Sequence, residues 1–270
     1  NGLLAMFASL LNFNKVIAID VDEDFIAASK QTAEATGFKQ IIFINGSEDA
    51  LCQIDANGRS MVLAGTDVIE HIYNLDFFLT NLGKADKILL ALFTTASNPL
   101  NPRIVRRLKK QQISDELYGG TSSDRSLFGN DHISFLSSRE SIIRKNFPEI
   151  GADEVKILAQ VSRGLRKDDI IEMVHRFLSS NIYMSVIEHP TNTCDPETGS
   201  WSERLIELPE YKDLFNRHGF SLKVVNGFYD SFTGGRVVRF IISVLNKVIY
   251  SFPALGVYAA PYIILVGKRK

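Results

Sequence analysis

The first hundred residues alternate between short apolar runs and segments in which apolar residues recur at helical spacing. The apolar runs are rich in β-branched side chains, which is typical of strands that are buried on both faces of a sheet. Strands are predicted at residues 15–21, 41–44, 60–65 and 87–93. Helices are predicted within residues 1–13, at 22–36, around 47–54 and at 75–82. This rhythm predicts an α/β fold with a doubly wound, mostly parallel sheet, because crossover helices must cover both faces of a parallel sheet.

The rhythm breaks at two turn signals, Asn98-Pro99 and Asn101-Pro102, and the chain then becomes richer in charge, Ser and Gly up to about residue 181. The predicted helices of this region lie at 104–117, 138–146 and 168–179. Farther on, strands are predicted at 182–187, 220–225 and 262–266, and helices at 210–218 and 237–250. We therefore expect an insertion that lies over the sheet, followed by a return of the chain to the sheet.

Length and composition exclude several classes of protein. With 270 residues and 45% hydrophobic content, the chain buries a large core and is neither fibrous nor disordered. The net charge of −1 offers no overall basic surface, so no nucleic-acid partner is expected. One basic cluster is interpreted as a solvated helix face, with a contact site as the alternative: Arg103, Arg106, Arg107, Lys109 and Lys110. Two distant cysteines, Cys52 and Cys194, indicate a reducing compartment, and the cytoplasm is expected.

The most apolar stretch of the chain, residues 237–266, is interrupted by polar residues and by proline: Arg239, Asn246, Lys247 and Pro253. It therefore lacks the run of about twenty apolar residues that a membrane-spanning helix requires. We favour a buried helix followed by a strand. The alternative is a helix that lies at a membrane surface, which would make the protein a peripheral membrane partner.

The strand predicted at 15–21 contains a carboxylate near its end, Asp20, and a helix follows. In nucleotide-binding α/β folds such a carboxylate accepts hydrogen bonds from ribose hydroxyls, and ligands lie outside the carboxyl ends of the strands. A structural role in the turn is the alternative, because aspartate before a helix is common. The pattern alone therefore fits a nucleotide ligand and a structural aspartate equally well.

Three further strings extend this pattern: NGSED at 45–49, TDVIEHI at 66–72 and GNDHISFLSS at 129–138. With them, the sequence resembles the Rossmann-like, class I S-adenosylmethionine-dependent methyltransferases that carry an Asp-Val-Leu/Ile-Glu-His motif after the fourth strand. The resemblance covers residues 1–95 well and the final strand-helix-strand unit more loosely. It implies S-adenosyl-L-methionine as the cofactor.

The resemblance also implies that part of the fold precedes Asn1. In the family, the first strand lies at the centre of the sheet, between the second and fourth strands, and ends in a Gly-rich loop. That loop leads into a segment similar to NGLLAMF at 1–7. We therefore expect a fragment of a longer protein that lacks this strand. Its expected parts are an incomplete cofactor-binding core at 1–98, an insertion, lid and substrate region at 99–200, and a unit at 201–270 that completes the sheet.

The resemblance assigns cofactor contacts to seven residues. They are Gly2 in the Gly-rich loop, Asp20 at the ribose, Val21 on the adenine, Ser47 and Glu48 near the adenine amino group, and Gly65 and Thr66 beside the methionine part. A helix cap explains Ser47 and Glu48 equally well.

Two histidines are candidate catalytic bases, His71 in the TDVIEHI string and His132 in the insertion. For His132, a surface histidine without a catalytic role explains the sequence equally well. For His71 and Glu70 we favour a structural role, in which they brace their loop against neighbouring backbone. A metal site formed by Asp67, Glu70 and His71 on one helical face is the less favoured alternative, and no metal is assigned. Trp201, Glu203 and Arg204 are interpreted as anchors of a long polar loop that begins at residue 189.

The predicted function is methyl transfer to a small-molecule, glycan-precursor or lipid-linked acceptor, with oxygen as the favoured acceptor atom. The first alternative is a binding module that kept the sheet and lost catalysis. The second is an NAD-dependent oxidoreductase, which also binds ribose through an acidic residue but requires a Gly-x-Gly-x-x-Gly loop.

Overall fold

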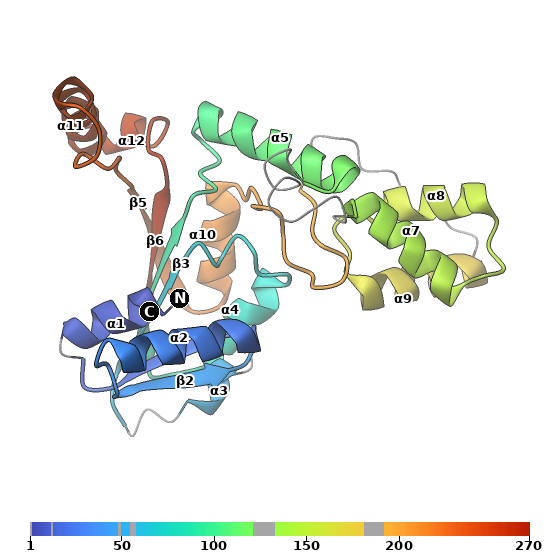
Figure 1. Ribbon diagram of the computed structural model, residues 1–270, viewed down its shortest axis with the longest axis horizontal. Coiled ribbons are helices and arrows are strands. Elements are labelled where there is room, and N and C mark those ends of the chain that lie inside the picture. Colours follow the sequence, from blue (N-terminus) through green and yellow to red (C-terminus); the bar gives the residue numbers. More distant parts are fainter. Residues whose placement is uncertain (1, 12, 48–49, 55–57, 121–132, 181–191) are drawn as a thin grey trace.

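The computed structural model describes residues 2–11, 13–47, 50–54, 58–120, 133–180 and 192–270 (Figure 1). Glu48, His132 and the strand predicted at 182–187 lie outside the described residues. Within the described ranges the chain is an α/β protein, as the sequence predicts. The other predicted strands and helices are present, with ends that differ by a few residues from the expected ones.

The described strands form two sheets. β1 (Val16–Asp20) and β2 (Ile41–Asn45) pair in parallel, with Val16 opposite Ile41 and Asp20 opposite Asn45. The second sheet has the order β3-β4-β6-β5 and contains β3 (Met61–Thr66), β4 (Ile88–Thr95), β5 (Phe220–Asn226) and β6 (Ile263–Arg269). In the described part of the chain, β1 and β3 do not pair with each other.

The four-stranded sheet is mixed. β3 and β4 are parallel, whereas β6 is antiparallel to both of its neighbours. The chain leaves β5 and enters β6 at the same end of the sheet, since Asn226 lies opposite Ile263, and this connection requires an antiparallel pair. Because β4 and β5 are both antiparallel to β6, β5 runs in the same direction as β3 and β4. The expectation of mostly parallel strands therefore holds within each sheet except for β6, which is reversed.

Two apolar clusters accompany the two sheets. Between α1 (Leu3–Leu10), α2 (Glu23–Ala35) and the first sheet, a small core contains Met6, Val16, Ala33 and Ile41. A larger core joins the second sheet to α3 (Ala50–Gln53), α4 (Leu75–Lys84) and α10 (Leu208–Arg217). Local capping fixes where two of these helices begin, because Asp22 accepts hydrogen bonds from backbone amides of α2 and Asn74 from an amide of α4.

A third cluster belongs to the helices between β4 and β5. These are α5 (Pro102–Tyr118), α7 (Phe135–Asn146), α8 (Ala152–Val161) and α9 (Lys167–Ser180). The last three pack on one another around an apolar core of their own and extend away from the sheet, so they differ from the expected lid over it (Figure 1). The sequence did not predict α8, whose N-cap, Gly151, makes no side-chain cap.

Near the C-terminus, α11 (Arg236–Ser251) and α12 (Pro253–Gly256) lie at one end of the second sheet (Figure 1). The favoured prediction of a buried helix is wrong here, because Ile249 is the one fully buried residue of α11. Most apolar side chains of α11 therefore lie at the molecular surface. No helix among the described residues combines the length and the apolarity that crossing a bilayer requires.

Candidate functional site

A buried carboxylate, Glu70, lies in the turn that follows β3. Its Oε1 accepts a hydrogen bond of 2.6 Å from Thr95 Oγ1 at the end of β4, and its Oε2 has no hydrogen-bond partner among the described residues. Burial raises the pKa of Glu70, and the hydrogen bond from Thr95 opposes this shift only in part. Burial, together with the nearby Glu70 charge, also raises the pKa of Tyr211, whose buried hydroxyl has no partner in the described part. A buried polar group of this kind is costly for stability and is therefore a candidate for function.

The His71 ring lies beside this carboxylate in a fixed orientation. His71 Nδ1 is 2.7 Å from the carbonyl oxygen of Trp201. Because a carbonyl can only accept a hydrogen bond, Nδ1 carries the proton, and Nε2 of the neutral ring is an acceptor. His71 Nε2 is 4.0 Å from Glu203 Oε1, and the His71 side chain is about one third exposed (36%). The ring can therefore receive a proton from a molecule in solution.

Glu203 completes the group and was not predicted as a site residue. Its Oε2 accepts a hydrogen bond of 2.9 Å from Ser97 Oγ, just beyond β4. Glu203 and Asp67 are also the non-glycine residues with positive φ in the described ranges, at 51° and 50°. Such backbone conformations are unfavourable for these residues and occur often at functional sites. No local signal in the sequence marks Glu203, since more than a hundred positions separate it from His71.

Glu70, His71 and Glu203 each offer one ligand atom, and these atoms lie within 4.8 Å of one another. The set has the chemistry that a divalent cation accepts. The sequence suggested Asp67, Glu70 and His71 as an alternative metal site, whereas the structure groups Glu203, and not Asp67, with Glu70 and His71. The reason is local: residues 67–71 form a turn, in which the His71 amide bonds to Val68 O at 3.0 Å, and not a longer helix.

The polar loop is anchored to this turn, as the sequence predicts. Trp201 N donates to His71 O at 3.2 Å, and Arg204 N donates to Glu70 O at 3.2 Å. The Trp201 indole donates to Tyr73 O at 3.0 Å, and the two rings stack with their centroids 6.2 Å apart. The favoured interpretation, in which Glu70 and His71 brace their loop, agrees with these contacts. The same contacts hold the two side chains in the geometry described above.

The residues predicted to contact a cofactor divide between the two sheets. In the first unit, Asp20 lies at the end of β1, where its Oδ1 accepts a hydrogen bond of 3.0 Å from the Asp22 amide. The neighbouring Val21 is 71% exposed, and Ser47 is exposed beyond β2. Gly2, with a φ of 68°, precedes α1, where a Cβ would lie 3.0 Å from Ser29 Cβ. The structure thus brings these residues to one small unit.

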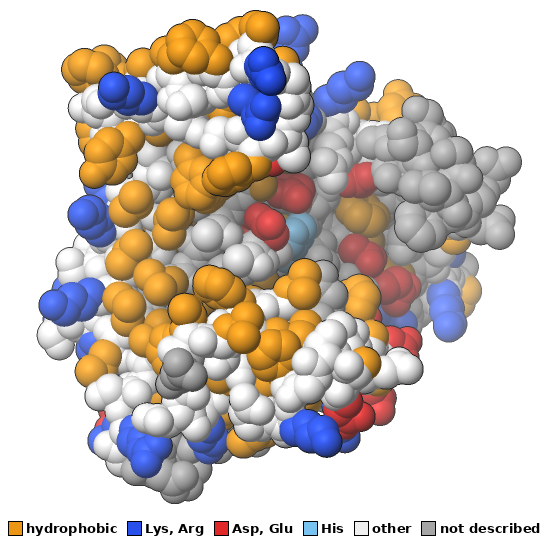
Figure 2. All heavy atoms as spheres, turned by 60° about the vertical axis from the view of Figure 1, so that its left-hand side comes forward, with side chains coloured by type: hydrophobic (Ala, Val, Ile, Leu, Met, Phe, Trp, Pro, Cys, Tyr) orange, Lys and Arg blue, Asp and Glu red, His pale blue; other side chains and the backbone are white. Residues whose placement is uncertain are grey.

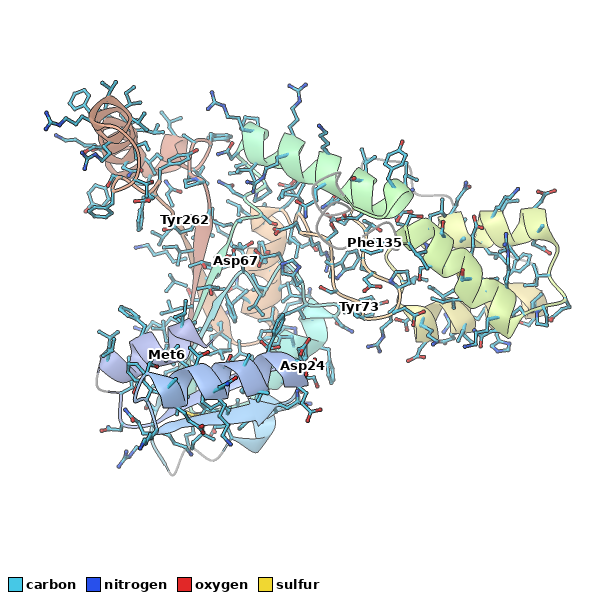
Figure 3. The ribbon with its side chains drawn as sticks, viewed as in Figure 1. Met6, Asp24, Asp67, Tyr73, Phe135 and Tyr262 are labelled. Carbon is cyan, nitrogen blue, oxygen red and sulfur yellow. The ribbon has the colours of Figure 1, made fainter. Side chains whose placement is uncertain are left out.

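The remaining predicted cofactor residues, Gly65 and Thr66, end β3 in the second sheet. A Cβ on Gly65 would lie 3.0 Å from the Phe93 ring, so packing against β4 also accounts for this glycine. Since β1 and β3 belong to different sheets, Asp20 and Thr66 do not lie on neighbouring strands. Asp67 lies beside the long strands in Figure 3, above the first unit in this view. Figure 2 shows acidic side chains and a histidine in a hollow, with apolar side chains above and below it.

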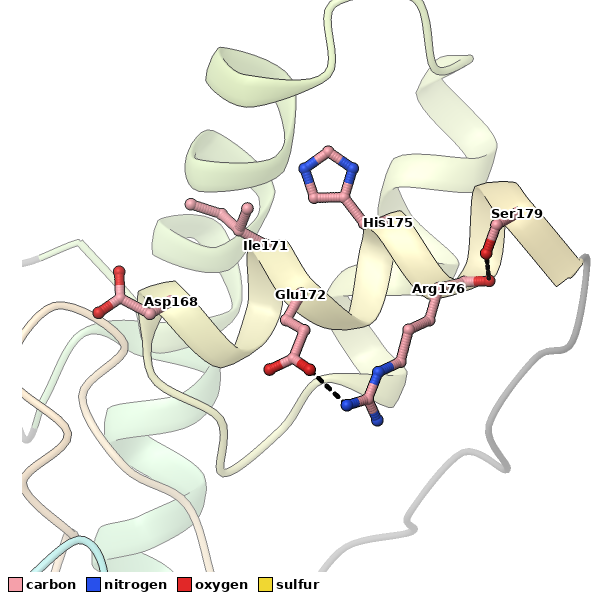
Figure 4. A pocket seen from close by; sticks show the side chains of 6 residues that line it. All are labelled: Asp168, Ile171, Glu172, His175, Arg176 and Ser179. Carbon is pink, nitrogen blue, oxygen red and sulfur yellow. Dashed lines mark hydrogen bonds and ion pairs between the residues drawn. The ribbon is translucent and has the colours of Figure 1, made fainter.

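A second hollow, of about 630 Å³, lies on the outer face of α9 (Figure 4). Its lining comes from this one helix: Asp168, Ile171, Glu172, His175, Arg176 and Ser179. Glu172 is paired with Arg176, and the His175 ring packs edge-on against Phe147 with centroids 4.9 Å apart. Because Glu172 and Arg176 pair with each other and the lining comes from a single helix, we do not assign a reaction to this face.

Comparison with known proteins gave no match to a protein-family model and no match to a curated protein. Several solved structures are similar at low identity. The YcgJ protein from Bacillus subtilis is 12% identical to this chain, with a TM-score of 0.38. A putative methyltransferase from Bacillus halodurans C-125 is 11% identical, also with a TM-score of 0.38. Each of these two matches covers 95% of this chain and 83% of the other chain. PKMT2 from Rickettsia typhi, in complex with AdoHcy, is 10% identical with a TM-score of 0.36, over 95% of this chain and 44% of the other. Similarity at this level does not assign the chain to a family.

Proposed function

We propose that the chain is part of an S-adenosylmethionine-dependent methyltransferase that acts on a small-molecule, glycan-precursor or lipid-linked acceptor, with oxygen as the acceptor atom. The observation that carries the proposal is the position of the Asp67–His71 turn directly after β3. There it presents a histidine whose Nε2 makes no hydrogen bond among the described residues, beside a buried carboxylate. Ligands of open α/β sheets bind outside the carboxyl ends of the strands, which is where this turn lies.

The strand order also supports the proposal. The methyltransferases that the sequence resembles have their first strand between the second and the fourth. In this chain β1 and β3 correspond to those two strands, and the interruption between the sheets falls between them. A further parallel strand at this position would join the two sheets and bring the ends of β1 and β3 to the same edge.

The residues of the first unit fit a nucleoside in their chemistry. The Asp20 carboxylate can accept hydrogen bonds from ribose hydroxyls, and the exposed Val21 side chain offers an apolar surface to adenine. S-adenosylmethionine supplies an electrophilic methyl group when it is bound. We propose that Gly65, Thr66, Ser47 and Glu48 contribute the remaining contacts.

His71 has the geometry of a general base in this proposal. The hydrogen bond from Nδ1 to Trp201 O leaves Nε2 to take the proton of an acceptor hydroxyl, and the Glu203 carboxylate stabilises the imidazolium that forms. Methyl transfer otherwise depends on positioning and on exclusion of water, so few side chains take part. A second base, His132, remains a proposal that rests on its place in the insertion.

The test is calorimetric titration of the full-length protein with S-adenosylhomocysteine and, separately, with NAD. We expect binding of S-adenosylhomocysteine alone, and Asp20→Ala should weaken it by at least about tenfold, since a hydrogen-bonded contact to the ribose is worth more than about 1.4 kcal/mol when a charged group accepts it. The matched control is Asp24→Ala, because Asp24 is another exposed carboxylate, in the first turn of α2. This variant should bind S-adenosylhomocysteine as tightly as the unaltered protein does.

Binding of NAD in place of S-adenosylhomocysteine would favour the oxidoreductase. A titration that Asp20→Ala leaves unchanged would remove the basis of the assignment. Tight S-adenosylhomocysteine binding without methyl transfer to any extract of the source cells would favour the binding module that has lost catalysis.

A further inference from the structure

Helix α11 presents an apolar stripe to solvent. Val237, Phe240, Ile241, Val244 and Val248 are 72%, 70%, 58%, 47% and 49% exposed. Their spacing of three, four, seven and eleven positions places them on one face of the helix. The opposite side, around the buried Ile249, contacts the protein. The stripe is therefore a surface that the described part of the chain leaves uncovered.

Neighbouring segments extend this surface. The exposed large side chains on either side of the stripe are Phe232, Tyr250, Phe252, Leu255 and Tyr258. Figure 2 shows apolar side chains in a row along the top of the molecule with Lys and Arg side chains beside them, and Figure 3 shows rings that project outward from this end. Contiguous apolar surfaces of this kind mark contacts with proteins or membranes.

The charges around the stripe have one sign. Residues 231–262 contain Arg236, Arg239 and Lys247 and no Asp or Glu. Arg236 and Lys247 are eleven positions apart, so they lie along the same border of the stripe. The last acidic residue before this segment, Asp230, accepts hydrogen bonds from Phe232 N and Thr233 Oγ1 and so belongs to a local turn.

Helix α5 adds a second cationic face at the same end of the molecule (Figure 1). Asn101, its N-cap, donates to Ala260 O at 2.9 Å, and Asn98 donates to Val257 O at 2.8 Å, which ties α5 to the segment after α12. The first half of α5 carries five cations and no acidic residue: Arg103, Arg106, Arg107, Lys109 and Lys110. Three of them line an open hollow of about 530 Å³ together with aliphatic side chains of Val105 and Ile113.

We propose that α11, α12 and the first half of α5 form a docking surface for a lipid bilayer that contains anionic phospholipids. The apolar stripe would enter the boundary between headgroups and acyl chains, and the cations along its border and on α5 would contact phosphate groups. At 16 residues, α11 is about 24 Å long and lies in the plane of the membrane. This inference does not depend on the proposed reaction.

Charge also distinguishes the bilayer from a second copy of the chain. In an antiparallel pair of α11 helices, the cationic borders would face each other, and like charges repel. An anionic surface neutralises the same cations. The combination of exposed aromatic and aliphatic residues with cations on one border therefore favours a lipid surface.

The test is co-sedimentation of the full-length protein with vesicles of phosphatidylcholine alone and with vesicles in which about a third of the lipid is phosphatidylglycerol. We expect binding to the anionic vesicles that weakens with added salt, since screening shortens the range of the charges. Phe240→Ser combined with Ile241→Ser should weaken it at least about tenfold, and Arg236→Gln combined with Lys247→Gln should weaken it by several-fold. Phe25→Ser is the matched control, because Phe25 is 59% exposed on α2, and should bind as before.

All these side chains are exposed, so circular dichroism should show that each variant folds. Three results would overturn the proposal: no binding to either vesicle, equal binding to both vesicles, or binding that the Phe240 and Ile241 substitutions do not affect. A dimer detected by light scattering that the same substitutions abolish would assign the surface to a second copy instead.

Discussion

Two buried carboxylates occupy different environments in this molecule. Glu116, at the junction of α5 with the other helices of the insertion, accepts hydrogen bonds from Arg139, Arg163 and Thr193. Glu70, after β3, accepts one side-chain hydrogen bond from Thr95 and has a buried oxygen without a partner in the described residues. Burial alone would raise both pKa values. The arginine contacts of Glu116 reverse this shift and hold its pKa below the usual value, whereas the pKa of Glu70 stays raised.

The comparison separates a structural region from a candidate functional one. A buried charge whose hydrogen bonds are complete holds elements together and offers nothing to a ligand. Glu70 differs, because one of its buried carboxylate oxygens has no hydrogen-bond partner in the described residues. It also lies beside an oriented histidine and near two residues with strained backbone conformations, Asp67 and Glu203, so it can still bind a ligand or take part in a reaction. The two regions therefore predict opposite responses to substitution.

The largest effect is expected at the Glu116 junction. Arg139→Leu removes one partner of a buried ion pair and leaves the charge of Glu116 incompletely compensated, so the free energy of unfolding should fall by about 3–5 kcal/mol. Urea denaturation followed by circular dichroism measures this change. Arg176→Leu is the control, because its pair with Glu172 is exposed and should contribute about 0–1 kcal/mol. Equal losses from the two substitutions would show that the junction is not a structural centre.

The second effect concerns His71, where activity should fall and stability should not. His71→Gln keeps a hydrogen-bond donor for Trp201 O and removes the basic Nε2, so methyl transfer should slow by about 10² or more, which is about 2.7 kcal/mol in activation free energy. The measurement is transfer of label from radioactive S-adenosylmethionine to lipid and water-soluble extracts of the source cells. S-adenosylhomocysteine affinity is the control and should not change.

Chelation decides between the two roles that the His71 geometry allows. If His71 acts as a base, EDTA should leave transfer unchanged. Loss of transfer on chelation, with recovery on addition of Mg²⁺ or Mn²⁺, would instead assign Glu70, His71 and Glu203 to a cation.

The sequence predicted those features that depend on local pattern. Apolar runs located β1 to β6, and the TDVIEHI string was recognised at a position that proved to follow β3. The starts of α2 and α4 also depend on local contacts, because Asp22 and Asn74 bond to amides only two or three positions away. The helix α8 was not predicted, and its N-cap, Gly151, makes no side-chain cap.

Features that depend on distant contacts were not predictable from the sequence. Glu203 reaches the site only because the loop around Trp201 bonds back to His71 and Glu70, more than a hundred positions away. The reversal of β6 follows from the end of the sheet at which the chain returns. The sequence correctly located the apolar helix α11. An apolar pattern does not show whether the helix packs against its own chain or against another molecule, so the exposure of α11 was not predictable.

The smallest effect is a pH dependence of opposite sign for the two carboxylates. The folded pKa of Glu70 is raised above its ordinary value of 4.5, so its contribution to stability is present below pH 4.5 and is lost as the pH rises through the folded pKa. The folded pKa of Glu116 is lowered, so its contribution is present above pH 4.5 and is lost as the pH falls through the folded value.

Glu70→Gln keeps the shape of the side chain and removes its charge. The variant should therefore be closest to the unaltered protein near pH 4 and exceed its free energy of unfolding at pH 8, because burial makes the charged form of Glu70 less favourable in the folded protein than in the unfolded chain. Denaturation curves at the two pH values measure the difference, and Glu116→Gln should be less stable than the unaltered protein at pH 8. If Glu70→Gln is instead less stable than the unaltered protein at pH 8, the folded protein stabilises the ionised Glu70 carboxylate. Glu70 would then have the same structural role as Glu116.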